Sequence, residues 1–181
     1  MVSYKVLIFA TVLVSITGQP LEILQNVISN TIQTVKQQKS EISQVGDFWT
    51  TLVTHFMYEG IAQATQECVD SLGDKCTSDK LKQIADCVNS STVKNDVTAA
   101  LSAFVNPLMA ELDGIEKDLG NSSTDIKIVD KDIESMNLSR TDEESFVYRK
   151  NKAQSQFIVD VNPIVNLIPQ IASKCLASLI P

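Results

Sequence analysis

The sequence predicts an all-helical fold, an irregular helical bundle of about six or seven helices held by two disulfides. Apolar residues recur at intervals of three and four along almost the whole chain, and the alternation typical of strands is absent. The four cysteines form an even set. A chain of 181 residues is long enough to bury a core, so we expect residues 19–181 to form a single helical domain.

Residues 1–18 have the layout of a secretory signal peptide. A basic start from Met1 to Lys5 precedes an apolar run from Val6 to Ile16, and small residues follow. The run is shorter than the roughly 20 apolar residues that cross a bilayer. We therefore expect a secreted, extracellular protein without a membrane span, made in a pathway that forms disulfides and attaches glycans.

The first predicted helix covers residues 21–45. Its apolar stripe includes four residues spaced seven apart, which would suit a coiled-coil seam: Leu21, Ile28, Val35 and Ile42. The intervening core positions hold Thr31 and Gln38, so a helix packed on its own domain is the favoured alternative. Gly46 and Asp47 should end this helix and cap the next.

Residues 48–72 predict a central buried helix, because apolar side chains lie on every face: Phe48, Trp49, Leu52, Val53, Phe56, Met57, Tyr58 and Ile61. Gly73 should end this helix. A short helix then begins at Thr77 or Ser78. The cleanest periodicity runs from Val93 to Leu119, with a kink expected at Pro107 and a stop at Gly120.

Three further helical segments complete the chain. Residues 126–136 predict a short helix. Thr141 and Glu144 form a capping-box pattern that opens the next helix, which Asn162-Pro163 should interrupt. Residues 164–179 form the terminal helix, with Pro169 as a second kink site. Polar residues within that run favour a docked helix over a lipid-anchor signal.

The cysteines are predicted to be structural. Their spacing fits no zinc site, and partner histidines are missing. Three connectivities are open. We favour Cys68–Cys76, a staple across the turn at Gly73, which leaves Cys87 to pair with Cys175 on the terminal helix.

Three Asn-x-Ser sequons fall at joints between predicted helices, where a sugar can be tolerated. We expect glycosylation at Asn89, Asn121 and Asn137.

The residue pattern argues against catalysis, and we expect no cofactor, metal ion or catalytic residue. His55 is the only histidine, and we expect a neutral imidazole within the aromatic helix. No Ser-His-Asp or Cys-His set can therefore form around another base. Paired carboxylates remain open, although no pair stands out. The acidic stretch 125–134 alternates with lysines as a solvated face does.

Two functions remain. A net charge of −7 disfavours nucleic acid as a partner. The first function is binding a lipid or another small apolar molecule between the aromatic helix and the helix kinked at Pro107. Its expected pocket residues are Trp49, Phe56, Met57, Phe104 and Leu108. The second is an interaction or structural glycoprotein that meets a protein partner in an extracellular fluid through its surface.

Overall fold

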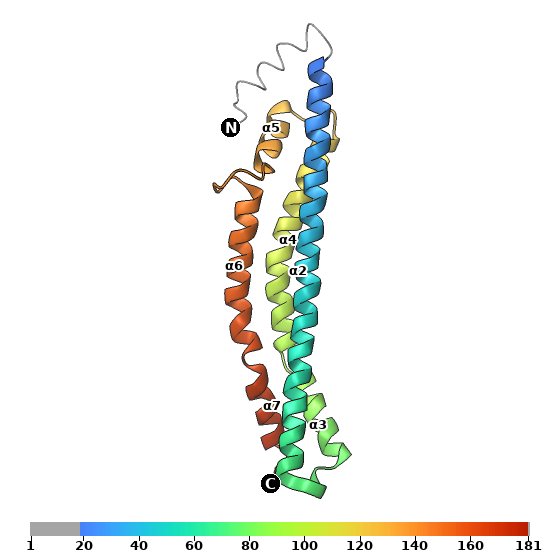
Figure 1. Cartoon of the computed structure of the whole chain (residues 1–181), viewed down its shortest axis with the longest axis vertical. Helices are drawn as coiled ribbons and strands as arrows, with labels where there is room; N and C mark the ends of the chain where they lie inside the picture. The colour runs from blue at the N-terminus through green and yellow to red at the C-terminus, as the bar shows by residue number, and fades with distance from the viewer. Residues whose placement is uncertain (1–18, 181) are drawn as a thin grey trace. The chain divides into compact units, whose positions relative to one another are not determined.

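The structure is a computed structural model that describes residues 19–180, so the predicted signal peptide lies outside the described residues. Every regular element among them is helical, which confirms the predicted class. Figure 1 shows the order along the chain: α2 (Gln19–Leu72), a 3-10 turn (Gly73–Lys75), α3 (Ser78–Asn89), α4 (Val93–Gly120), α5 (Ile126–Ser135), α6 (Phe146–Val165) and α7 (Ile168–Ala177). The predicted number is corrected: four helices are long (α2, α3, α4 and α6), and α5 and α7 have only ten residues each.

The predicted break at Gly46 and Asp47 is wrong, because α2 continues through both residues for 54 residues in all. A glycine inside a helix costs about 1 kcal/mol relative to alanine, an amount that packing can offset. At Gly46 a Cβ would lie 3.9 Å from Leu101 Cδ2, so the helix backbone packs closely against α4 here. One turn later, Thr50 Oγ1 donates to the Gly46 carbonyl at 2.9 Å, which is compatible with an unbroken helix.

The prolines also lie differently from the prediction. α6 includes Pro163 and ends at Val165, so the interruption falls after the expected Asn162-Pro163 step. Pro169 lies in the first turn of α7, where its missing N–H removes no helical hydrogen bond and no kink is required. Pro107 lies inside α4, which continues on both sides of it.

The chain divides into two compact units, each built from two segments. Among the described residues, unit 1 comprises residues 19–41 and Met109–Lys150, and unit 2 comprises Ile42–Leu108 and residues 151–180. The buried apolar side chains of unit 1 come from four helices and from the residue that follows α5: Val35, Leu112, Ile115, Leu119, Val129, Met136 and Phe146. This core supports the side chains that line the larger of the two clefts described below.

Polar groups of α2 are also buried in unit 1. Thr31 Oγ1 donates to the Val27 carbonyl at 2.9 Å, and Gln38 Oε1 accepts from Lys150 Nζ at 2.6 Å. Lys150 Nζ also lies 2.7 Å from Glu41 Oε2, and this hydrogen bond is the main reason that the pKa of Glu41 is lowered. The polar positions within the heptad pattern are therefore buried with their hydrogen bonds satisfied.

In unit 2, the prediction that residues 48–72 are buried on every side is wrong. The buried residues of this part of α2 form one stripe at helical spacing: Val53, Met57, Gly60, Ala64 and Cys68. Phe48 and Tyr58 are 59% and 64% exposed. Aromatic rings tolerate partial exposure, so counting them as core residues overestimated the buried face.

Candidate functional site

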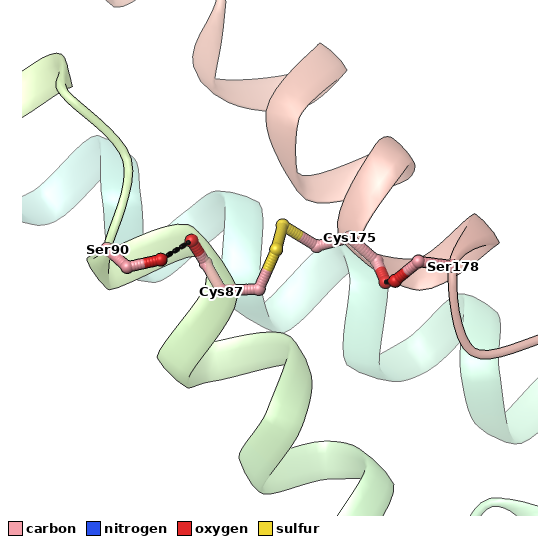
Figure 2. Close-up of a disulfide and its surroundings, with 4 residues drawn as sticks. All are labelled: Cys87, Ser90, Cys175 and Ser178. Carbon is pink, nitrogen blue, oxygen red and sulfur yellow. Dashed lines mark hydrogen bonds between the residues drawn. A yellow bond between two sulfur atoms is a disulfide. The ribbon is translucent and has the colours of Figure 1, made fainter.

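The disulfides join Cys68 to Cys76 and Cys87 to Cys175, the pairing favoured from the sequence. Figure 2 shows the second bridge, which connects the last turn of α3 to the last turn of α7. On each side, the serine three residues later donates to the carbonyl of the bridged cysteine: Ser90 to Cys87 at 2.9 Å and Ser178 to Cys175 at 2.7 Å. The bridge therefore links two helix ends whose carbonyls already have partners.

All three sequon asparagines are exposed and lie at helix ends or in connections. Asn89 is the last residue of α3, whereas Asn121 and Asn137 follow α4 and α5. The Oδ1 atom of Asn121 accepts from the Ser123 hydroxyl at 2.8 Å, and that of Asn137 accepts from the Ser139 hydroxyl at 2.7 Å. These positions leave room for a sugar, so glycosylation stays a prediction at each site.

The five residues of the predicted pocket all lie in unit 2. Met57, Phe104 and Leu108 are buried, and Trp49 is half-buried. Phe157, which the sequence did not assign to the pocket, lies between two of the rings, with its centroid 5.2 Å from that of Trp49 and 5.4 Å from that of Phe104. Its ring fills space that a ligand would need beside Phe104.

Phe56 lines a different space, a cleft of about 310 Å³ between α2 and the α6–α7 junction, here called the α7 cleft. Its walls are Phe56, Glu59, Gly60, Gln63, Val165, Asn166, Ile168 and Pro169. At Gly60 a Cβ would lie 2.9 Å from Ile168 Cγ2, so this glycine allows α7 to approach α2 closely. Sequence reasoning identified Phe56 but missed the α7 side of the cleft.

His55, expected within the aromatic helix, lies on the exposed face of α2. Its side chain is 62% exposed, and Nε2 lies 3.2 Å from Glu59 Oε1 one turn later. Its exposure has the same origin as that of Phe48 and Tyr58, since this side of α2 is not covered within unit 2.

Unit 1 contains a larger cleft of about 750 Å³, here called the charged cleft. Residues of α4, α5, the α5–α6 connection and the start of α6 line it: Glu111, Gly114, Ile115, Asp118, Lys131, Asp132, Glu134, Ser135, Arg140, Glu143, Glu144 and Arg149. Six of these side chains are carboxylates and three are cationic, so acidic groups dominate the lining. No sequence pattern indicates this cleft, because its residues come from four separate segments.

Both arginines of the charged cleft are held by hydrogen bonds. Arg149 pairs with Glu111 and also donates to Ser135 Oγ at 3.2 Å and to the Glu143 carbonyl at 2.9 Å. Arg140 donates to Glu144 Oε2 at 2.6 Å. Through these hydrogen bonds, the two guanidinium groups hold the walls of the cleft in place.

The predicted capping box of Thr141 and Glu144 is absent, and Asp142 acts instead. Asp142 Oδ1 accepts from the Glu144 backbone N–H at 3.1 Å, and Oδ2 accepts from Arg140 at 3.0 Å. The hydrogen bond from Arg140 is the main reason that the pKa of Asp142 is lowered. α6 begins only at Phe146, so the acidic residues precede the helix and belong to the connection.

Asp132 is the least satisfied group of the charged cleft. Its Oδ2 atom is buried and has no hydrogen-bond partner, and Asp130 Oδ1 is in the same condition. Burial, and then the negative charges of Asp118 and Glu111, raise the pKa of Asp132. The prediction that residues 125–134 form a solvated face is therefore wrong for these two carboxylates. For Asp132, the sequence feature that could have indicated burial is its position three residues after the buried Val129, on the same side of the helix.

Over residues 19–180, no cluster of three or more acidic, histidine or cysteine side chains is arranged to hold a metal ion. No described helix combines the length and apolar character needed to cross a membrane. No family of proteins, no curated protein and no solved structure matches this chain.

Proposed function

We propose that this chain is a secreted, glycosylated binding protein that holds a small apolar molecule in the α7 cleft and performs no catalysis. The observation that carries the proposal is the cleft of about 310 Å³ with several apolar walls. Ligand sites usually have volumes of about 300–1,000 Å³ and are lined mainly by apolar side chains, so the α7 cleft suits a compact ligand.

The walls of the α7 cleft also indicate the chemistry of the ligand. Phe56, Ile168 and Pro169 offer apolar surface to a ring or a short chain. Gln63 and Asn166 provide amide groups that can hydrogen bond with one polar group of the ligand. The best match is a small amphipathic molecule, and a whole phospholipid would extend well beyond this space.

Secretion is supported by the signal-like residues 1–18 and by the two disulfides of unit 2. The absence of catalysis is supported by the position of His55, whose imidazole faces away from the buried stripe and pairs with Glu59. Secretion from a eukaryotic cell line and glycopeptide mapping would test the first part. We expect glycans on the three sequons, and intracellular retention of the chain would contradict secretion.

A surface-acting glycoprotein is the alternative. It is favoured by the ring of Phe157, which fills the interior between Trp49 and Phe104 where the sequence predicted a pocket. In that case the exposed rings of Phe48 and Tyr58 are available to a protein partner.

Titration of the secreted protein with the fluorescent apolar probe N-phenyl-1-naphthylamine distinguishes the two functions. Val165 lines the α7 cleft, and Leu167 lies two residues later, exposed and outside the lining. Val165→Trp should abolish probe binding by filling the cleft, whereas the matched control Leu167→Trp should retain it. Equal binding by both variants, or none by the unchanged protein, would refute the carrier and leave the surface-acting alternative.

A further inference from the structure

We propose that the charged cleft of unit 1 binds an organic cation, a molecule that carries one or more ammonium groups on an aliphatic body. The site shares no residue with the α7 cleft, and the inference does not depend on the function proposed above. Three observations carry it: the charge of the lining, a buried carboxylate oxygen without a partner, and a glycine that keeps one wall open.

The charge of the lining favours a cation. Six carboxylates face three cationic groups, and the two arginines are already held by Glu111, Glu134 and Glu144. Asp118 and Asp132 have no comparable ion pair. After burial, the negative charge of Asp118 contributes most to the raised pKa of Asp132, and the positive charge of Lys131 opposes it. A ligand that brings positive charge would relieve this repulsion, most strongly in the partly buried part of the cleft where water screens least.

The orphaned oxygen indicates what the ligand must supply. Asp132 Oδ2 is buried without a hydrogen-bond partner, although buried acceptors are nearly always satisfied. Ammonium groups are strong donors without an acceptor of their own. Asp132 lines the cleft, so a turn of its carboxylate that brings Oδ2 to an ammonium group there would satisfy the oxygen and neutralise its charge in the same contact.

Gly114 provides the space. It lies in the interior of α4 and lines the charged cleft, and a Cβ built on it would meet no atom within 4 Å. Alanine would make this helix more stable by about 1 kcal/mol, so local stability does not explain the glycine. The missing side chain leaves α4 open to the cleft beside Ile115, where an aliphatic segment of the ligand can make apolar contact.

The spread of the carboxylates favours an extended cation over a single metal ion. The acidic groups belong to α4, α5 and the connection before α6, and across the described residues none form a metal-binding group of three or more. A volume of about 750 Å³ fits a multi-atom ligand. Ammonium groups separated by methylene units can reach carboxylates on opposite walls, which one small ion cannot.

The test is calorimetric titration of the full chain with spermidine at low ionic strength, and with the uncharged 1,8-octanediol for comparison. Spermidine should bind at one site and octanediol should not. Asp132→Asn should weaken binding at least about tenfold, as loss of one charged hydrogen bond implies. Asp160→Asn is the matched control, since it removes one exposed carboxylate in unit 2 and changes the net charge equally.

Gly114→Leu provides an independent variant that retains every carboxylate and fills the open wall. It should abolish spermidine binding while circular dichroism shows an unchanged helical content. The proposal is overturned by any of three results: no binding to the unchanged protein, equal weakening by Asp132→Asn and Asp160→Asn, or full binding by a folded Gly114→Leu variant. The second result would mean that spermidine only associates with the acidic surface.

Discussion

The same substitution, glycine to alanine, should have opposite effects at two helix-interior positions. Gly114 lies in α4 and Gly60 in α2, and both have ordinary helical backbone, since the one described glycine with positive φ is Gly73. In each case alanine should gain about 1 kcal/mol from helix propensity. The environment of the new methyl group then decides the sign of the change.

At Gly114 the new Cβ meets nothing within 4 Å, so the gain should appear almost in full. At Gly60 the Cβ would lie 2.9 Å from Ile168 Cγ2 and 3.5 Å from Ala172 Cβ. Optimal carbon–carbon separations are about 3.5–4.0 Å. Ile168 is only 2% exposed and cannot turn away freely, so overpacking should cost about 1–3 kcal/mol.

We therefore expect Gly114→Ala to be more stable than the unchanged protein by about 0.5–1 kcal/mol, and Gly60→Ala to be less stable by up to about 2 kcal/mol. Urea denaturation followed by circular dichroism measures both, with an unchanged m value showing that the denatured state is the same. For a chain of this size, each 1 kcal/mol shifts the Tm by about 2–4 °C. Equal stabilisation by the two substitutions would refute the close approach of α7 to Gly60.

Other predictions test the core, the bridges and the buried carboxylate. Replacing both cysteines of the Cys87–Cys175 bridge with serine should lower the free energy of unfolding by about 4.5 kcal/mol in the chain-entropy model, because a long loop is released. The same change at Cys68–Cys76 releases a short loop and should cost about 2.5 kcal/mol. Denaturant titration under matched conditions should show the larger loss for the Cys87–Cys175 variant. Phe157→Ala should cost about 3–5 kcal/mol, whereas Phe48→Ala, at an exposed ring, should change stability by less than about 0.5 kcal/mol. The pKa of Asp132 is raised in the folded state, so the folded protein binds this proton more tightly than the unfolded chain does. The free energy of unfolding should therefore fall as the pH rises through the folded-state pKa and the carboxyl ionises. Asp132→Asn should therefore be more stable than the unchanged protein at neutral pH, and the difference should shrink in acid; a constant difference from pH 7 to pH 3 would contradict the raised pKa.

The periodicity of apolar residues was sufficient to predict the helical class, but it did not locate every helix boundary. Val93 to Gly120 was recognised because its stripe has no gap, and α4 has these bounds. Gly46 misled the prediction because propensity is a local quantity, whereas its contact with Leu101 comes from a distant part of the chain. The break predicted at Asn162-Pro163 was placed too early, since α6 continues for two residues beyond Pro163.

The disulfide pairing was accessible because the turn at Gly73 places Cys68 and Cys76 near each other in sequence, so elimination leaves the longer bridge. The clefts were not accessible in this way. Whether an aromatic residue such as Phe56 lines a space or fills it depends on the neighbours that face it, and Ile168 and Pro169, which share the α7 cleft with Phe56, come from a distant part of the sequence.

Asp132 illustrates why the charged cleft could not be read from the chain. In sequence it is one of several alternating charges, and such a pattern usually indicates a solvated helix face. It lies on the side of α5 that the buried Val129 and, directly after the helix, Met136 turn inward. The negative charges of Asp118 and Glu111 on α4 then add to the effect of burial on its pKa. The buried oxygen without a donor on this carboxylate arises only when α4 and α5 meet. A sequence pattern can identify which residues carry charge, whereas tertiary packing decides how much free energy it costs to bury that charge and whether a hydrogen-bond partner offsets the cost.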